Sequence, residues 1–181
     1  FIGSHLVEEL LSNENEILIF DNCLTGKKEN LEFTGNFKFI NDDFGSENSL
    51  EKIEKFDPDI CFHLAAQSSV VVSVENPALD FEHNILQPIK LLQVLLRSSC
   101  KKLVFTSSGG TIFGEPFVIP TAEEDYADEP ESPYGVAKKR LNELIKIMTK
   151  NSDLKYSILN LSNVYGPRQD PHGEAGVVSI F

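Results

Sequence analysis

Strand-like apolar runs alternate with helical patterns along most of the chain, and this alternation limits the folds open to it. The predicted strands are Glu16 to Asp21, Phe37 to Asp43, Asp59 to Ala66, Lys102 to Ser107 and Tyr156 to Leu161. The predicted helices are Ser4 to Leu11, Glu47 to Lys55, Pro77 to Arg97 and Tyr134 to Lys150. Continuous apolar strands suit a sheet buried on both faces. The pattern predicts an α/β fold built on a parallel, doubly wound sheet.

Composition excludes several classes of partner. The net charge of -12 argues against nucleic acid, which needs a basic face. No apolar run reaches the roughly 18 residues of a membrane span, and no secretory leader is visible, so we expect no membrane partner. Cys23, Cys61 and Cys100 are an odd number without metal-ligand spacing. They predict a reduced, cytoplasmic protein without a metal site.

Both ends of the sequence are abrupt. Phe1 leads at once into a helical pattern with no methionine before it, and an apolar-rich segment from Glu174 is unfinished at Phe181. We therefore expect one globular domain truncated at both ends, with its N-terminal strand missing upstream of Phe1.

The residues that close the predicted strands are the first functional candidates, because ligands bind at the carboxyl ends of such strands. Asp21 closes the first strand eighteen positions after Gly3, which opens the first helix. A glycine at a strand-to-helix turn, followed about 20 residues later by an acid for the ribose hydroxyls, is a dinucleotide fingerprint. Only its last glycine is present, but the partial match favours a Rossmann-like domain.

The next two strands end on further candidates. Asp43 and Phe44 could bind the amino group and the face of an adenine, although a solvated turn explains them equally well. Leu64-Ala65-Ala66-Gln67 closes the third strand, and its small side chains would let a ligand approach the backbone.

A tyrosine stands one helical turn ahead of a lysine after Ser132-Pro133. Tyr134 and Lys138 are four residues apart, so both face the same side of the predicted helix. A buried ammonium would lower the phenol pKa from about 10 and make Tyr134 a usable proton carrier. Alone the pair is a weak signal, because such spacings occur by chance on solvated helices.

Hydroxyls and glycines follow the fourth strand, from Thr106 to Gly114. An ordinary loop would look similar. Together with Tyr134, however, these hydroxyls could hydrogen-bond the substrate oxygen that the tyrosine deprotonates.

These motifs together resemble the extended short-chain dehydrogenase/reductases of the NAD-dependent nucleotide-sugar epimerase/dehydratase family, and are most similar to its UDP-glucose 4-epimerases. The matching segments are Phe1 to His5, Asp21-Asn22 with Gly26, Asp43-Phe44, His63 to Gln67, Asn84, Ser107 to Gly114, Ser132 to Tyr134 with Lys138, and Asn163 to Gln169. The resemblance implies that residues 1–181 are an NAD-binding domain and that most of the substrate domain is absent.

The resemblance also implies individual roles. The expected NAD contacts are Phe1, Ile2 and Gly3 at the pyrophosphate, Asp21, Asn22 and Gly26 at the adenosine ribose, Asp43 and Phe44 at the adenine, and Leu64, Ala65, Ala66, Gln67, Asn84, Ser107, Tyr134 and Lys138 along the remaining cleft. Asn163 matches a position that contacts the sugar nucleotide, a UDP-hexose.

Three positions depart from the family pattern. Phe113 replaces a usual tyrosine, and Asn160 replaces a common arginine. Gly109 stands where many relatives carry the catalytic serine or threonine. The hydroxyl role then passes to Thr111 or Ser108, with Thr111 slightly favoured.

The two residues that follow Gly109 also bear on which type of reaction the family resemblance implies. Dehydratases and decarboxylases of the family usually carry an acid at the positions of Gly110 or Thr111, and neither is acidic here. The resemblance therefore implies 4-epimerisation through a transient 4-keto sugar, with a dehydratase, a decarboxylase or a 4-keto reductase as alternatives. A non-catalytic nucleotide-sensing module is a further alternative, but such proteins normally lose the tyrosine and lysine.

Two predicted helices also suggest self-association. Pro77 to Arg97 and Tyr134 to Lys150 carry apolar residues on more than one side, as the family's homodimer bundle would require. Burial against the sheet explains much of the same pattern.

Overall fold

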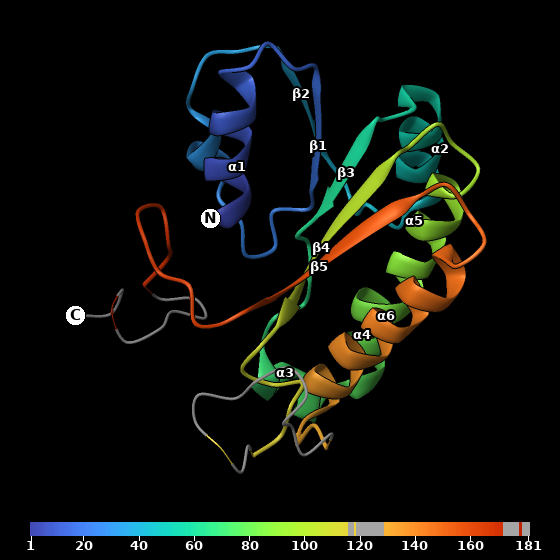
Figure 1. Ribbon diagram of the computed structural model, residues 1–181. Coiled ribbons are helices and arrows are strands. Elements are labelled where there is room, and N and C mark those ends of the chain that lie inside the picture. Colours follow the sequence, from blue (N-terminus) through green and yellow to red (C-terminus); the bar gives the residue numbers. More distant parts are fainter. Residues whose placement is uncertain (116–117, 119–128, 172–177, 179–181) are drawn as a thin grey trace. The chain divides into compact units, whose positions relative to one another are not determined.

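The computed structural model describes residues 1–115, 118, 129–171 and 178 (Figure 1). It consists of two compact units, Phe1–Phe56 with Val164–Phe181, and Asp57–Asn163. Of the apolar-rich segment at 174–181, all but Val178 lies outside the described residues. Across the described part of the chain, no helix is both long and apolar enough to cross a membrane.

The first unit contains a parallel pair of strands with helices around it. Its elements are α1 (Ile2–Leu11), β1 (Ile17–Asp21), the 3₁₀ helix η1 (Lys28–Leu31), β2 (Phe37–Asn41) and α2 (Glu47–Phe56). The strands pair from Ile17 opposite Phe37 to Asp21 opposite Asn41, so both carboxyl ends lie at one edge.

The second unit is a three-stranded parallel sheet in the order β3-β4-β5. Its elements are β3 (Ile60–His63), α3 (Val70–Glu75), α4 (Pro77–Phe81), the π-helix η2 (Glu82–Leu86), α5 (Gln87–Leu95), β4 (Lys102–Ser108), α6 (Pro133–Thr149) and β5 (Lys155–Leu161). Helices α4, α5 and α6 gather on one face of this sheet (Figure 1). Its largest buried side chains include Phe105, Leu92, Leu95, Leu141 and Ile145.

The α/β class and the parallel strands are confirmed, with corrections at the strand ends. The second strand stops at Asn41 instead of Asp43, and the third stops at His63 instead of Ala66. After Asn41 the chain turns, because the side chains of Asp42 and Asp43 accept backbone N–H groups of the turn, and after His63 it continues as a loop.

The helix predicted from Pro77 to Arg97 contains a π-turn in its middle. There the Gln87 N–H donates to the Glu82 carbonyl, five residues back. Pro88 has no N–H and its ring crowds the carbonyl four residues earlier, so a wider turn relieves the clash.

Helix α3 is absent from the sequence-based prediction. Its residues, Val70-Val71-Val72-Ser73-Val74-Glu75, are mostly β-branched and indicate a strand. Ser69 overrides this tendency, because its Oγ accepts a hydrogen bond from the Val72 N–H at 3.1 Å and caps the helix.

Candidate active site

Helix α6 carries the tyrosine and lysine that the sequence singled out. Ser132 caps it by accepting the Gly135 N–H at 3.1 Å, and Pro133 occupies the first turn, where its missing N–H does no harm. Tyr134 is 9% exposed and Lys138 is 3% exposed. The pair therefore does not lie on a solvated helix face.

The end of β4 fixes the direction of Lys138. Its Nζ donates to the Thr106 carbonyl at 3.2 Å and lies 4.9 Å from the centroid of the Phe105 ring. The same Nζ is 5.8 Å from the centroid of the Tyr134 ring. Burial lowers the pKa of Lys138 to about 8, against the opposing effect of the Asp80 carboxylate. At neutral pH the side chain is thus mostly a cation beside Tyr134.

His63 packs on Phe105, the same aromatic ring that the Lys138 ammonium contacts. Its ring stacks on Phe105 with centroids 5.6 Å apart and planes at 19°. Burial, reinforced by the charge of Lys138, lowers the pKa of His63 to about 3. The ring is therefore neutral at physiological pH. In the sequence His63 stood out only as the start of a family motif.

The backbone of the turn after β4 lies next to the beginning of α6. Gly135 approaches so closely that a Cβ there would be 2.4 Å from the Thr111 carbonyl oxygen. The hydroxyl oxygens of Ser107 and Thr111 are both buried without a hydrogen-bond partner in the described structure. In the backbone of this turn, the Ser108 carbonyl accepts the N–H groups of Thr111 and Ile112, at 3.4 and 3.3 Å.

Gly109 is held against β5. Its N–H donates to the Leu161 carbonyl at 2.7 Å, and a Cβ would lie 3.0 Å from the Asn160 carbonyl oxygen. A side chain at this position would press on the strand. This close packing against β5 agrees with the presence of glycine at position 109, where many relatives carry a serine or threonine.

A second polar cluster joins Gln67 and Asn84 through Asp80, a residue that the sequence does not single out, and their contacts with NAD stay a prediction. The Asp80 Oδ1 accepts the Gln67 Nε2 at 2.7 Å and the Asn84 Nδ2 at 2.9 Å. The Asn84 Nδ2 also donates to the Gln67 carbonyl at 2.8 Å. A signal was available, because Asp80 interrupts an apolar helical pattern four residues before Asn84.

The remaining candidates of this unit lie in loops. The loop between β3 and Gln67 contains Leu64, Ala65 and Ala66. Asn163 is exposed and lies just past the end of β5.

In the first unit, Asp21 and Gly26 are brought together at the end of β1. A Cβ on Gly26 would lie 3.0 Å from the Asp21 Oδ2. The Asp21 Oδ1 accepts the Cys23 N–H at 2.8 Å, and the Asn22 Oδ1 accepts the Leu24 N–H at 3.2 Å. Asp21 therefore caps its own turn while its carboxylate stays exposed.

Asp43 and Phe44 follow β2 in a turn that a neighbouring acid organises. Asp43 Oδ1 accepts the Gly45 N–H at 2.9 Å. Asp42, which the sequence analysis passed over, accepts from Ser46, Asn48 and Ser49 at 2.9 to 3.0 Å. These hydrogen bonds lower the pKa of Asp42. The turn is built by Asp42, and an adenine contact by Asp43 stays a prediction.

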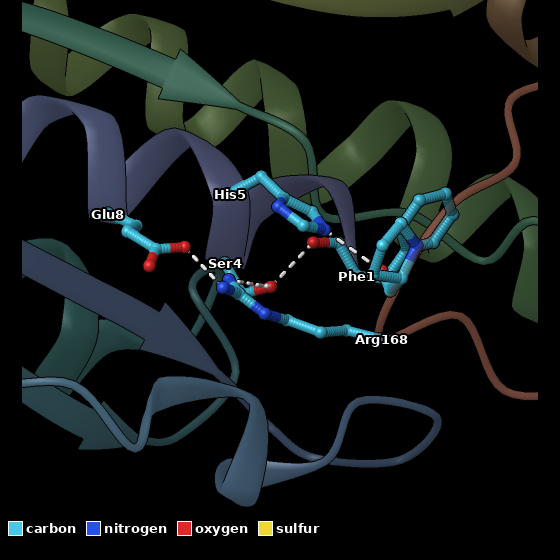
Figure 2. A network of polar contacts seen from close by, with 6 residues as sticks. Phe1, Ser4, His5, Glu8 and Arg168 are labelled. Carbon is cyan, nitrogen blue, oxygen red and sulfur yellow. Dashed lines mark hydrogen bonds and ion pairs between the residues drawn. The ribbon is translucent and has the colours of Figure 1, made fainter.

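The first and last family motifs meet around α1, as Figure 2 shows. Ser4 Oγ donates to the Phe1 carbonyl at 2.7 Å, and Arg168 donates to Ser4 Oγ at 3.3 Å and pairs with Glu8. His5 Nε2 hydrogen-bonds the Pro167 carbonyl at 2.9 Å. Ile2 and Gly3 open the helix, and a Cβ on Gly3 would meet no atom of the described residues within 4 Å.

Parallel α/β units and a buried Tyr-x-x-x-Lys pair define a Rossmann-like protein of the short-chain dehydrogenase type. The chain belongs to the NAD dependent epimerase/dehydratase family, whose profile matches residues 1–181.

Several relatives are similar over the whole of this chain. The UDP-glucose 4-epimerase of Mycolicibacterium smegmatis is 39% identical over 184 residues, which cover 100% of this chain and 58% of that protein. The structure of UDP-glucose 4-epimerase with UDP-glucose from Thermotoga maritima superposes with a TM-score of 0.93 at 42% identity, covering 99% of this chain and 58% of that one. That of the Thermus thermophilus UDP-glucose 4-epimerase in complex with NAD gives 0.90 at 44% identity, with the same coverage. The chain thus spans a little over half the length of these relatives.

The buried histidine predicts acid sensitivity. Because the folded-state pKa of His63 is depressed to about 3, its contribution to stability is complete above the unfolded pKa of about 6.5 and is lost as pH falls below that value. Replacing His63→Phe removes the titrating group. The drop in unfolding free energy from about pH 7 to about pH 5 should shrink by about 2 kcal/mol.

Urea unfolding at the two pH values measures this difference. Phe105→Leu, which removes the stacking partner but no titrating group, should destabilise the protein equally at both. An unchanged drop in His63→Phe would show that His63 is not the source of the acid sensitivity.

Proposed function

We propose that the whole protein is an NAD-dependent nucleotide-sugar 4-epimerase that interconverts UDP-glucose and UDP-galactose. The observation that carries the proposal is the buried Tyr134–Lys138 pair, in the same unit as the hydroxyls of Ser107 and Thr111, which are buried without hydrogen-bond partners among the described residues. A phenol next to a buried cation is suited to take and return the proton of a sugar hydroxyl.

The residues present fit a dinucleotide. Helix α1 begins at Ile2 and Gly3, and a helix N-terminus is suited to bind a pyrophosphate. Buried polar atoms without partners in the described structure, Asn84 Oδ1 and Ser107 Oγ among them, are suited to ligand contacts. Phe1 to Gly3 would hold the pyrophosphate, Asp21 the ribose, and Gln67, Asn84 and Ser107 the remainder. When bound, NAD would accept hydride from the sugar C4 and return it to the other face.

In this mechanism Tyr134 removes the proton from the sugar 4-hydroxyl, and the Lys138 cation stabilises the phenolate form before the transfer. A hydroxyl of the β4 turn donates a hydrogen bond to the same oxygen as it becomes a carbonyl. We favour Thr111 as this donor, because its hydroxyl is buried without a hydrogen-bond partner among the described residues and its backbone lies close to Gly135 of α6. Tyr134 then returns the proton after the keto sugar has turned over.

One observation favours epimerisation over dehydration or decarboxylation. A Cβ on Gly110 would meet no atom of the described residues within 4 Å, so their packing does not exclude an acidic side chain there. The missing acid is therefore a chemical difference from relatives that carry one. A 4-keto reductase remains the second candidate, and net consumption of NADH would identify it.

We also propose a cytoplasmic homodimer. Leu79, Leu86 and Ile147 are exposed apolar side chains on the two predicted dimer helices, and a second copy would cover them. The three cysteines are free, as in a reducing compartment.

The first test of the mechanism removes the proton carrier. Tyr134→Phe in the whole protein deletes one hydroxyl from a buried ring, so turnover of UDP-galactose should fall by about 10² to 10⁴ while NAD still binds. A coupled assay for UDP-glucose and calorimetry with NAD measure the two effects. A near-normal rate would mean that another residue carries the proton.

A matched pair of variants assigns the assisting hydroxyl. Thr111→Val keeps the side-chain shape and deletes its hydroxyl, so kcat should fall by about 10-fold to 100-fold. Ser108→Ala should change kcat by less than about threefold. The reverse order of effects would assign the role to Ser108.

The choice of cofactor tests Asp21. Its carboxylate should repel the 2′-phosphate of NADP, so NAD should bind about 100-fold more tightly than NADP. In Asp21→Asn the amide oxygen can still accept the Cys23 N–H, but the charge is gone, so the preference should largely disappear.

Calorimetry with both cofactors gives the ratio of the two dissociation constants. Glu29→Gln removes an equal charge from η1 of the same unit and should leave the ratio unchanged. If Asp21→Asn retains the full preference for NAD over NADP, the assignment of Asp21 to the ribose is wrong, and its carboxylate only stabilises the turn after β1.

A further inference from the structure

A fully buried carboxylate lies in α4, outside every motif that the sequence analysis connected with chemistry. Asp80 has 0% exposed surface. Both hydrogen bonds that its carboxylate accepts from the described residues, from Gln67 and from Asn84, end on Oδ1. Its Oδ2 is buried and has no partner in the described residues. Burying a charged carboxylate costs free energy unless hydrogen bonds or an opposite charge offset the loss of water. The Oδ2 atom is therefore available to interact with a positive charge.

The adjacent helix supplies a buried charge of opposite sign. Helix α4 packs on α6 (Figure 1), which carries Lys138. In the described structure the Lys138 Nζ makes one hydrogen bond, to the uncharged Thr106 carbonyl. An ammonium group has three donors. The neutral groups around them therefore leave both the Asp80 carboxylate and the Lys138 ammonium with unused hydrogen-bonding capacity.

The other titratable groups around this pair do not replace Asp80 as a counter-charge. His63, from β3, is neutral, and Tyr134, from α6, is the proton carrier itself. His83, from η2, hydrogen-bonds Gln87 at 3.2 Å. Among these neighbours Asp80 is the anion.

We propose that Asp80 is a positioning residue of the epimerase site: it holds Gln67 and Asn84 in place and keeps Lys138 cationic, so that Tyr134 can carry the proton. The inference rests on the proposed function for its catalytic meaning. The electrostatics agree with the geometry, since Asp80 raises the pKa of Lys138 against the effect of burial. Conversely, Gln67, Asn84 and Lys138 oppose the effect of burial, which raises the pKa of Asp80.

Asparagine separates the two parts of this role. Because both hydrogen bonds end on Oδ1, Asp80→Asn can keep Gln67 and Asn84 in place through its amide oxygen. The variant loses only the charge and the unpaired oxygen. Asp57→Asn is the matched control, since it removes a carboxylate from the same unit and keeps the acceptor for the Ser99 N–H.

The decisive readout is the titration of Lys138 in the whole protein, followed by NMR of ¹³C-labelled lysine. Its resonance is assigned by its loss in Lys138→Arg. The midpoint should move to lower pH in Asp80→Asn and stay in place in Asp57→Asn. A midpoint that does not move in Asp80→Asn overturns the inference. This readout needs no turnover, so it decides the role of Asp80 even if UDP-sugars prove not to be substrates.

The pH–rate profile gives the catalytic consequence. The rate of Asp80→Asn relative to the parent should fall by about tenfold between about pH 6 and about pH 9, because neutral Lys138 no longer supports the phenolate. A flat ratio would contradict a role through Lys138. For Asp57→Asn the ratio should be flat.

A double variant covers the case in which Asp80→Asn folds poorly. Asp80→Asn with Lys138→Met removes both buried charges, so it should melt at a higher temperature than Asp80→Asn alone. A double variant that melts no higher than Asp80→Asn would show that the two charges do not compensate each other, and the inference would fail.

Discussion

The burial of the Lys138 ammonium is the constraint on which the second unit depends. A lysine with 3% exposure has lost most of its hydration, and this loss must be offset by groups placed around it. The Thr106 carbonyl and the Phe105 ring come from β4, and the Asp80 charge comes from α4. Strand and helices thus have to hold one geometry for the cation to remain buried. The same geometry sets Tyr134 beside it.

The class of fold and the position of Tyr134 and Lys138 on one helix face could be predicted from the sequence because both follow from periodicity. Apolar runs locate the strands, and a spacing of four puts Tyr134 and Lys138 on one helix face. The π-turn at Glu82–Leu86 and the helix α3 could not be predicted in the same way. They depend on a single proline and a single capping serine, whose local effect overrides the average tendency of their neighbours.

Asp80 and the neighbouring pair Asp42–Asp43 show a second limit of the sequence. An acid in a sequence carries no sign of whether it faces a ligand, a turn or a buried cation. Asp42 proves to build the turn after β2, and Asp80 proves to be fully buried against two amide side chains. Only the arrangement of the surrounding donors distinguishes these roles, and those donors come from positions that are not adjacent in the sequence.

Two glycines explain how the turn after β4 comes close to helix α6. Gly135 lets the first turn of α6 approach the Thr111 carbonyl, where a Cβ would lie at 2.4 Å, and Gly109 lets the turn lie against β5. A side chain at Gly109 would press on the Asn160 carbonyl, so a catalytic hydroxyl at that register would require β5 to shift. At Gly135 it is the backbone of Thr111 that lies close to the helix, and the Thr111 hydroxyl is buried without a partner among the described residues. These two observations support the proposal that Thr111 assists Tyr134.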